Sequence, residues 1–388
     1  MPNTPIYPDF PQEEYETRVR RARALMEAHR LDALLVTQWS TYVYFTGHRS
    51  PQKPGDKIRP YMFLLPRDGE PAIFVMPFEE GHVRMTSWFQ DVRLYQLLRH
   101  NETLADAIRE KGLAGARIGC ELGREQYLEL SYNDFTDLTR RLPDAHFVDA
   151  SGAFLALRMV KSPAEIERLR TVMRLTSRAL QRVFRDIKPG MTNLDVGRLV
   201  RRYCVEEGAE RTVSLAVASG HDLSKGKVSV PIPRVLEVGD TVTIDTAAEL
   251  QGYVSDVCWT GVAGEASQRQ RDMYKFVVEL NHKCYDALRA GNRCEDVVLT
   301  CRTEVERVGR KLQGVGRIGH GVGREGTEYP SLALGEKVVL EPGMVFACNP
   351  NFTTEFGFFN VEEDLAVTGG PPEILTGPLA PAELPVLG

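Results

Sequence analysis

The sequence of 388 residues lacks the features that mark several large classes of protein. No apolar run approaches the ~18 residues that a membrane-spanning helix needs, so we expect no membrane contact. Acidic residues (53) outnumber lysines and arginines (48), and the net charge of −5 predicts no nucleic-acid partner. A local basic cluster at Arg18 to Arg23 is interpreted as the solvated face of a helix.

Cysteine is scarce and scattered. The seven cysteines are odd in number and form no C-x-x-C pair, which argues against a disulfide framework or a zinc ribbon. The N-terminal segment carries prolines and acidic residues where a signal peptide would need basic residues followed by an apolar stretch. We therefore expect reduced cysteines and a cytoplasmic protein.

The length and a hydrophobic content of 43% predict a soluble protein with two domains. The first part alternates helical and strand patterns, which is typical of a small three-layer α/β domain ending near residue 155. Helices are predicted at 13–30 and near 101–112. Short apolar runs predict strands at 31–37, 61–66, 71–77, 116–122 and 146–151.

A long helix is predicted to open the second part of the chain. Ser162 can cap it, Pro163 suits its first turn, and Glu165 lies three residues after the cap. Later helices are predicted at 192–207, 266–290 and 294–312, with strands between and after them. We expect the Pro- and Gly-rich tail at 369–388 to be a surface extension.

Two carboxylates, Asp245 and Asp256, stand eleven residues apart at the ends of neighbouring strand patterns. If Leu250-Gln-Gly closes a hairpin, the two strands pair and both side chains converge. Convergent carboxylates are usual ligands of divalent cations. The alternative is two acids exposed to water at strand ends.

His320 lies within Gly316-Arg-Ile-Gly-His-Gly-Val-Gly, where four glycines let the backbone approach closely. A lone histidine is commonly structural, but beside convergent carboxylates it becomes a candidate ligand or proton-transfer group. Two further segments follow, Leu340 to Pro350 and Asn360 to Thr368.

In this order, the four segments resemble the pita-bread metallopeptidase family, which includes prolidase, aminopeptidase P, methionine aminopeptidase and the metal-free hydrolase creatinase. The runs LDALLVT and YVYFTGH extend the resemblance to the first part of the chain. It implies an α/β (α+β) protein with a C-terminal pita-bread (creatinase/aminopeptidase) domain at 158–388. A smaller N-terminal creatinase/prolidase-like α/β domain would occupy 1–157, and relatives that have it are commonly homodimers.

The resemblance also implies a set of metal ligands. These are Asp245, Asp256, His320, Asn349 and Glu362, with Glu363 as a one-residue alternative for the last. Asn349 stands where the family has a glutamate, and its neutral amide removes one charge from the site. We therefore expect one divalent ion (Mn, Zn, Fe or Co) per subunit rather than two, or none if the chain follows the metal-free members.

Two histidines of the family's peptidases are absent. One position is Thr327, just before Glu328, and the other falls near Lys227. The resemblance assigns those histidines to orienting the scissile carbonyl and the tetrahedral intermediate, so their loss argues against efficient Xaa-Pro cleavage. His221 could supply an imidazole from a nearby loop, and the alternative is a surface histidine.

Arg324 directly follows the glycine loop, where relatives carry an apolar residue. Its guanidinium could hold a substrate carboxylate bidentately, or it could form an ion pair with Glu325 or Glu328. Cys258 and Cys348 lie next to the ligand segments, and we expect both thiols to point away into the core.

The predicted function is metal-dependent hydrolysis of a C–N bond in a small substrate that carries a carboxylate, such as a dipeptide or an N-substituted amino acid. The metal would activate a water and polarise the carbonyl, while His320 with Glu362 or Glu328 handles the proton. Three alternatives stay open: metal-free hydrolysis, as in creatinase and ectoine hydrolase, a lyase like the dimethylsulfoniopropionate lyases, and a non-enzymatic binding protein. The last conflicts with the four family ligands that the chain retains.

Overall fold

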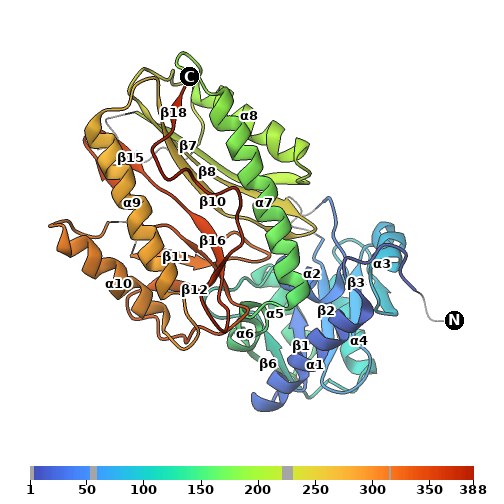
Figure 1. Ribbon diagram of the computed structural model, residues 1–388. Coiled ribbons are helices and arrows are strands. Elements are labelled where there is room, and N and C mark those ends of the chain that lie inside the picture. Colours follow the sequence, from blue (N-terminus) through green and yellow to red (C-terminus); the bar gives the residue numbers. More distant parts are fainter. Residues whose placement is uncertain (1–3, 53–58, 221–229, 314–315) are drawn as a thin grey trace. The chain divides into compact units, whose positions relative to one another are not determined.

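The computed structural model describes residues 4–52, 59–220, 230–313 and 316–388. The chain divides into two compact units, Met1–Arg158 and Met159–Gly388, one residue away from the predicted domain boundary. Among the described residues, no helix is long and apolar enough to cross a membrane. Each unit has its own sheets and helices (Figure 1).

The N-terminal unit is built on one six-stranded sheet with the order β4-β3-β2-β1-β5-β6. Its strands are β1 (Ala33–Val36), β2 (Met62–Pro66), β3 (Ala72–Val75), β4 (Asp91–Leu94), β5 (Arg117–Cys120) and β6 (His146–Asp149). Its helices are α1 (Gln12–Ala28), α2 (Trp39–Thr46), the 3₁₀ turn η1 (Pro77–Glu79), α3 (Glu80–Thr86), α4 (His100–Glu110), α5 (Tyr132–Arg141) and α6 (Ser151–Met159).

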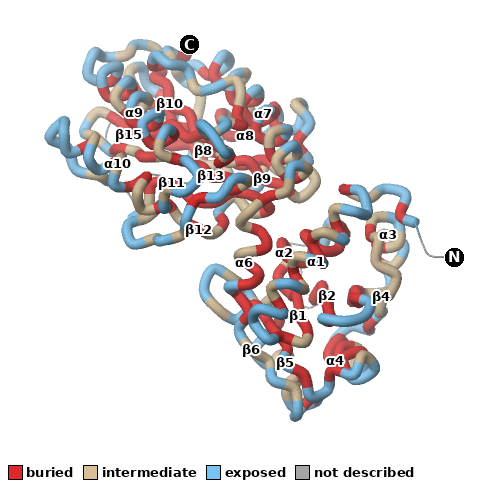
Figure 2. Tube along the Cα trace, turned by 60° about the horizontal axis from the view of Figure 1, so that its bottom comes forward, coloured by how far each residue is buried: buried red, intermediate tan, exposed pale blue. Residues whose placement is uncertain are grey.

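Strand β1 shows why this sheet has helices on both faces. Successive side chains of a strand point to opposite faces, so an entirely apolar strand needs cover on both. Leu34 and Val36 join a core that contains residues of α1 and α6, whereas Leu35 joins a second core with residues of α4 and α5. The predicted three-layer α/β arrangement is confirmed, and the central strands β1 and β2 are buried along their length (Figure 2).

Arg18 on α1 contradicts the solvated basic face predicted for this helix. Its side chain is 1% exposed, and its guanidinium carbon lies 4.4 Å from the ring centre of Tyr44. Its Nη1 donates to the Tyr44 carbonyl at 2.6 Å, and Glu14 pairs with it one turn earlier. Aromatic rings and a carboxylate thus replace water around the charge, which a sequence pattern of helical period does not reveal.

The C-terminal unit contains two larger sheets and a hairpin. The first has the order β18-β10-β8-β7 with β9 on β8, the second has the order β12-β11-β13-β16-β17, and β14 pairs β15. The strands are β7 (Arg211–Ser219), β8 (Thr241–Leu250), β9 (Tyr253–Val254), β10 (Val257–Ala263), β11 (Arg317–Gly321), β12 (Glu328–Ala333), β13 (Val345–Cys348), β14 (Phe352–Thr354), β15 (Gly357–Phe359), β16 (Glu363–Ala366), β17 (Glu373–Ile374) and β18 (Val386–Leu387).

Two pairs of helices cover these sheets. They are α7 (Pro163–Asp186), α8 (Asn193–Glu206), α9 (Gln268–Ala287) and α10 (Cys294–Arg307). Helices α7 and α8 pack against strands β7 and β8, whereas α9 and α10 pack against strands of the second sheet (Figure 1). The four helices match the four predicted in this part of the chain.

Helix α7 begins as the sequence predicts. The Glu165 amide donates to the Ser162 hydroxyl at 3.2 Å, and the Ser162 amide donates to the Glu165 carboxylate at 3.0 Å, with Pro163 in the first turn. This capping box satisfies amide groups that the first turn leaves without helical partners. Glu165 also accepts a hydrogen bond from Tyr253 at 2.8 Å, which ties the start of α7 to β9.

The C-terminal tail is not a surface extension, and that prediction is wrong. Strand β17 pairs with β16, and β18 runs parallel to β10. Leu375 and Leu387 are buried, at 0% and 1% exposure. The apolar residues between the prolines and glycines therefore complete the core, so composition alone misrepresents this segment.

Candidate metal centre and substrate site

A tight hairpin delivers the first two candidate ligands. Leu250 pairs with Tyr253, and the two residues between them have positive φ, 50° at Gln251 and 73° at Gly252. Positive φ at both central residues is the geometry that matches the twist of paired strands, and glycine adopts it without strain. The predicted closure of the hairpin is confirmed, and the returning chain passes through Asp256 into β10.

Asp245, Cys258 and Glu362 form a row across three segments. Asp245 on β8 lies opposite Cys258 on β10, and Cys258 is bridged in turn to Glu362 through two backbone hydrogen bonds. One potential ligand atom from each of the three lies within 4.8 Å of the others. Residues directly opposite one another in paired strands share a face, which explains this convergence.

The thiol of Cys258 therefore does not point away from the candidate ligands, and that prediction is wrong. Cys258 follows Asp256 by two residues, and a period of two places both side chains on one face. Cys348 differs, because it belongs to the apolar core packed against α9 and α10. It lies opposite Gly319 and Glu363, on the other face of the second sheet from His320.

A second triple contains His320. Its Nε2 lies 3.5 Å from Oδ2 of Asp256 and 3.9 Å from Oε1 of Glu362. Because Glu362 belongs to both triples, the structure brings together four of the five residues predicted as ligands, namely Asp245, Asp256, His320 and Glu362. Three strands of the second sheet, β11, β13 and β16, bring the histidine and the glutamate together.

The hydrogen bonding of His320 fixes which nitrogen can act as a ligand. Its Nδ1 lies 3.1 Å from the Gly321 carbonyl, which can only accept, so Nδ1 carries the proton. Burial, followed by the charge of Arg317, lowers the pKa of His320 to about 4. The neutral ring thus directs its Nε2 lone pair toward two carboxylates, an arrangement that a cation stabilises.

The donor set fits a divalent metal ion. Three carboxylates and one imidazole suit ions such as Mn, Fe, Co or Zn, which accept mixed oxygen and nitrogen ligands. The Cys258 sulfur lies at the edge of this set, next to Asp245 and Glu362. The side chains present are therefore compatible with the ion that the family resemblance implies.

Asp364 is a residue of this site that the sequence analysis missed. It follows Glu362 by two residues and is fully buried, and its Oδ2 accepts the backbone amide of Asp256 at 2.9 Å. Burial raises the pKa of Asp364 well above its usual value. Because side chains two positions apart in a strand share a face, the spacing between Glu362 and Asp364 could have identified Asp364 from the sequence.

Glu363, the alternative to Glu362, lies on the other face of its strand. Its Oε1 accepts the amide of Ala380 at 2.8 Å, and it borders a small cavity of about 30 Å³ together with residues of α9. Burial raises the pKa of Glu363 to about 7. The candidate cluster thus contains Glu362 and not Glu363.

Asn349 directly follows β13, two positions after Ala347, which lies opposite His320. Its backbone amide donates to Ile318 at 2.8 Å. His221 and Lys227 lie outside the described residues, so the substrate role of His221 stays a prediction.

The loop after His320 is held by Glu328. Its carboxylate accepts a hydrogen bond from the Arg324 backbone amide at 2.9 Å and forms an ion pair with Lys161 at 3.2 Å. The side chains of Glu328 and Lys161 are almost fully buried, at 5% and 3% exposure. A Cβ at Gly323 would lie 2.5 Å from Glu328 Oε2, so a larger residue there would displace the Glu328 carboxylate. A Cβ at Gly326 would lie 4.0 Å from Oδ2 of Asp256, which places the loop beside the candidate metal ligands.

The guanidinium of Arg324 is buried but only partly bonded. Its carbon lies 4.4 Å from the ring centre of Tyr253, and its Nη1 donates to Gly252 at 3.4 Å. Its Nε and Nη2 have no hydrogen-bond partner among the described residues, and Arg324 is 8% exposed. The predicted alternative, an ion pair with Glu325 or Glu328, is absent from the part of the chain that is described. Nε and Nη2 form an edge that grips a carboxylate bidentately.

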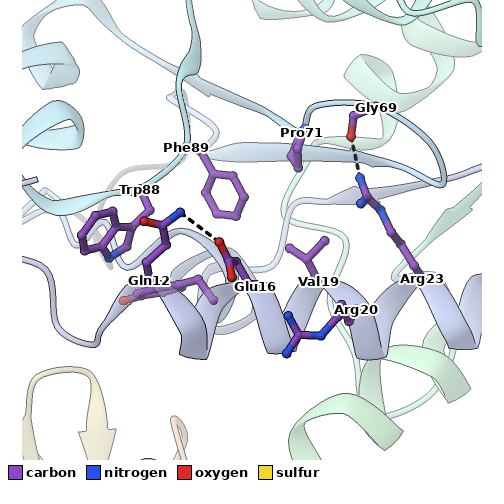
Figure 3. Close-up of a pocket in the computed structure, with 10 residues that line it drawn as sticks. Gln12, Glu16, Val19, Arg20, Arg23, Gly69, Pro71, Trp88 and Phe89 are labelled. Carbon is purple, nitrogen blue, oxygen red and sulfur yellow. Dashed lines mark hydrogen bonds between the residues drawn. The ribbon is translucent and has the colours of Figure 1, made fainter. Parts of the chain in front are cut away.

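A separate pocket of about 360 Å³ lies within the N-terminal unit (Figure 3). Several of its polar side chains already have partners, since Gln12 donates to Glu16 and Arg23 donates to the Gly69 carbonyl. None of the predicted site residues lines it.

Comparison with known proteins defines the class of this chain. Residues 167–369 match metallopeptidase family M24, and residues 18–160 match the creatinase/prolidase N-terminal domain. The chain therefore belongs to metallopeptidase family M24, which makes it a hydrolase and confirms the resemblance predicted from its motifs.

Individual relatives are distant but extend over nearly the whole chain. The chain is 25% identical over 381 residues to a protein named uncharacterized peptidase YqhT from Bacillus subtilis, covering 95% of this chain and 100% of that one. It is 24% identical over 360 residues to an Xaa-Pro dipeptidase from Pyrococcus furiosus, covering 90% and 95%.

Solved structures show the same fold. An Xaa-Pro dipeptidase from Bacillus anthracis aligns with a TM-score of 0.84 and 24% identity, over 96% of this chain and 100% of that chain. A prolidase from Pyrococcus horikoshii OT3 aligns with a TM-score of 0.82 and 22% identity, over 94% and 99%. The predicted pita-bread fold with an N-terminal creatinase-like domain is confirmed.

Proposed function

We propose that residues 158–388 form the catalytic domain of a metal-dependent hydrolase that cleaves a C–N bond in a small substrate carrying a carboxylate. A dipeptide and an N-substituted amino acid both meet this description. The observation that carries the proposal is the convergence of His320 Nε2 with the carboxylates of Asp256 and Glu362, at 3.5 and 3.9 Å. Membership of metallopeptidase family M24 supports the same reaction class.

We assign one divalent ion per subunit to Asp245, Asp256, His320 and Glu362. When bound, the ion would lower the pKa of a water molecule and would polarise the substrate carbonyl. Asn349 has an amide where a fifth ligand of the family is charged, so a second ion would have less charge compensation. A homodimer and a cytoplasmic location stay predictions.

The side chains around the ion divide the remaining tasks. Glu362 has a carboxylate inside the cluster and is our candidate to accept and return the proton, with His320 beside it. Glu328 was predicted for the same task, but its carboxylate already contacts Lys161 and the Arg324 amide. We therefore assign Glu328 to positioning the loop that carries Arg324.

Arg324 is proposed to bind the substrate carboxylate. Its Nε and Nη2 lie buried beside the loop that borders Asp256, so a bound carboxylate would satisfy two N–H groups and orient the scissile bond toward the cluster. The relatives named Xaa-Pro dipeptidase favour a dipeptide. Thr327, which lacks an imidazole where peptidases of the family carry one, favours a non-peptide C–N bond instead.

Purified protein with measured metal content would decide between these substrates. We would compare Xaa-Pro dipeptides, their C-terminal amides, and N-substituted amino acids such as creatine. Arg324→Ala should raise KM for substrates with a free carboxylate by about 10- to 100-fold, since a charge-assisted bidentate contact contributes roughly 1.5–3 kcal/mol. Turnover of the amides should change little.

The control is Arg198→Ala, which removes an exposed arginine of α8. Fast hydrolysis of Xaa-Pro dipeptides by both the wild type and Arg324→Ala would contradict the assignment of Arg324. Full activity in protein that contains no metal would instead favour the metal-free hydrolases of this fold.

A further inference from the structure

The N-terminal unit contains a second cluster of metal-binding side chains, His48, Glu79 and His82. One potential ligand atom from each lies within 4.8 Å of the other two. Nε2 of His48 is 3.2 Å from Oε2 of Glu79, and Nδ1 of His82 is 4.0 Å from the same oxygen. We propose that these three side chains bind a divalent transition-metal ion, with Zn²⁺ as the best fit.

Local structure explains how the three side chains meet. Glu79 ends η1, and His82 lies three residues later in α3, so the two share one face of a continuous helical turn. His48 follows Gly47, which ends α2 in the left-handed conformation with φ of 70°. A Cβ on Gly47 would collide with the Tyr15 hydroxyl, so only glycine allows the chain to turn here and present His48.

Neighbouring polar groups hold the atoms of the ligands that face away from the proposed ion. Nδ1 of His48 lies 2.9 Å from the Tyr42 hydroxyl. Oε1 of Glu79 accepts hydrogen bonds from Tyr61, at 2.9 Å, and from Ser50. Nε2 of His48 and Oε2 of Glu79 therefore remain directed at one another and at His82. Such outer hydrogen bonds are what orient histidine and carboxylate ligands in metal sites.

The exposure of the three side chains provides an entry path. The side chains of His48 and Glu79 are 0% and 6% exposed, whereas that of His82 is 41% exposed. With metal–ligand bonds of about 2.0–2.2 Å, two ligand atoms of a tetrahedral ion lie roughly 3.3–3.5 Å apart. The pair at 3.2 Å is already close to this separation, and only the solvent-exposed His82 needs to move.

The donor types select the kind of ion. Two imidazoles and one carboxylate favour Zn²⁺, Co²⁺ or Ni²⁺ over Mg²⁺ and Ca²⁺, which prefer sites composed of oxygen. Three protein ligands leave a fourth position for water. This cluster shares no residue with the proposed catalytic centre, so the two assignments are independent.

The alternative is a buried hydrogen-bond chain from Glu79 through His48 to Tyr42 that stabilises the unit without metal. That chain does not involve His82. His82→Ala therefore separates the two explanations, and alanine suits the helical position of this half-exposed residue. His82→Asn provides a second variant that keeps a polar side chain of similar size.

The test measures zinc bound per chain in the full-length protein, stripped with a chelator and dialysed against zinc. His82→Ala should bind one equivalent of zinc less than the wild type. The same change made in Asp256→Asn, where the catalytic cluster is impaired, should also remove one equivalent of zinc. His146→Ala, which removes an exposed histidine of β6, should retain that equivalent. A Co²⁺ titration followed by visible absorption should show the same loss.

Equal zinc in the parent and in both His82 variants would overturn the proposal and leave the hydrogen-bond chain as the explanation. Loss of zinc in the His146 variant as well would also overturn it, because it would show non-specific binding by surface histidines. Thermal unfolding of each variant verifies that the chain is folded when zinc is measured.

Discussion

Each of the two units contains a cluster of imidazole and carboxylate groups, but carboxylates are in the majority in one cluster and imidazoles in the other. The C-terminal unit combines three carboxylates with one histidine, whereas the N-terminal unit combines two histidines with one carboxylate. More carboxylates give more negative charge and suit harder cations, while imidazoles suit Zn²⁺ and its neighbours. The comparison teaches that the two clusters should differ in the metals they prefer and in what they contribute to hydrolysis.

The two clusters also differ in construction. The C-terminal cluster depends on strand register, because Asp245, Cys258 and Glu362 lie opposite one another in a row of paired segments. The N-terminal cluster depends on one helical turn, which carries Glu79 and His82, and on the glycine that precedes His48. We expect the first to tolerate fewer changes, since a shift in strand register moves every side chain to the other face.

The largest expected effect comes from Asp256→Asn. The Asp256 carboxylate loses its charge, so bound metal should fall. Hydrolysis should drop by more than about 100-fold, because changes outside the ligand set already cost roughly 10–100-fold. Metal analysis and initial rates measure both effects. His82→Ala is the matched comparison and should leave the rate of hydrolysis unchanged. Retention of stoichiometric metal at the C-terminal cluster in Asp256→Asn would show that Asp256 is not a ligand.

Asp364→Ala should have the next largest effect, although Asp364 is a positioning residue outside the proposed ligand set. Removal of the oxygen that accepts the Asp256 amide should weaken metal affinity by about 10–100-fold. Asp364→Asn keeps an acceptor oxygen for the Asp256 amide, so it should bind metal nearly as the wild type does. Chelator competition measures the affinities, and equal losses in both variants would contradict this role.

A buried carboxyl in the N-terminal unit should make its stability depend on pH. Burial raises the pKa of Glu121 to about 7, although its Oε2 accepts the amides of Thr37 and Gln38. A raised pKa favours the folded state when the group is protonated. This contribution is therefore complete below pH ~4.5 and is lost as the pH rises through about 7.

Glu121→Gln removes this titration and keeps an acceptor oxygen. The free energy of unfolding of the wild type should fall by about 1–3 kcal/mol more than that of the variant between pH 5 and pH 8. Urea unfolding at the two pH values measures the difference. Glu70→Gln, at an exposed position, is the control. A parallel pH dependence in the wild type and Glu121→Gln would refute the role of this carboxyl.

The smallest expected effect is that of Asn349→Glu, which restores the charge found in the family. A second ion should then bind more tightly, and metal per chain should rise toward two at the C-terminal cluster. Isothermal titration with Mn²⁺ measures this occupancy. If the stoichiometry does not change, Asn349 does not face the metal.

Much of the fold could be predicted because its signals are local. The capping box at Ser162 and Glu165 and the hairpin at Gln251 and Gly252 depend on residues only a few positions apart. The candidate ligands Asp245, Asp256 and His320 were found for a related reason, since each lies in a short motif whose backbone geometry is set by nearby glycines or strand alternation. Family resemblance then added Glu362, which no local pattern distinguishes from Glu363.

Other features required the tertiary structure. The sequence by itself determined part of the secondary structure, such as α1, α4 and the four helices of the C-terminal unit, because hydrogen bonding and side-chain alternation within a short segment specify them. It did not predict α2, α3, α5, α6 or β4. It did not determine the burial of Arg18, the docking of the tail, the role of Asp364 or the meeting of His48 with His82. These depend on which distant segments pack or pair together, and only the folded chain decides that, since burial and convergence are properties of the assembled core.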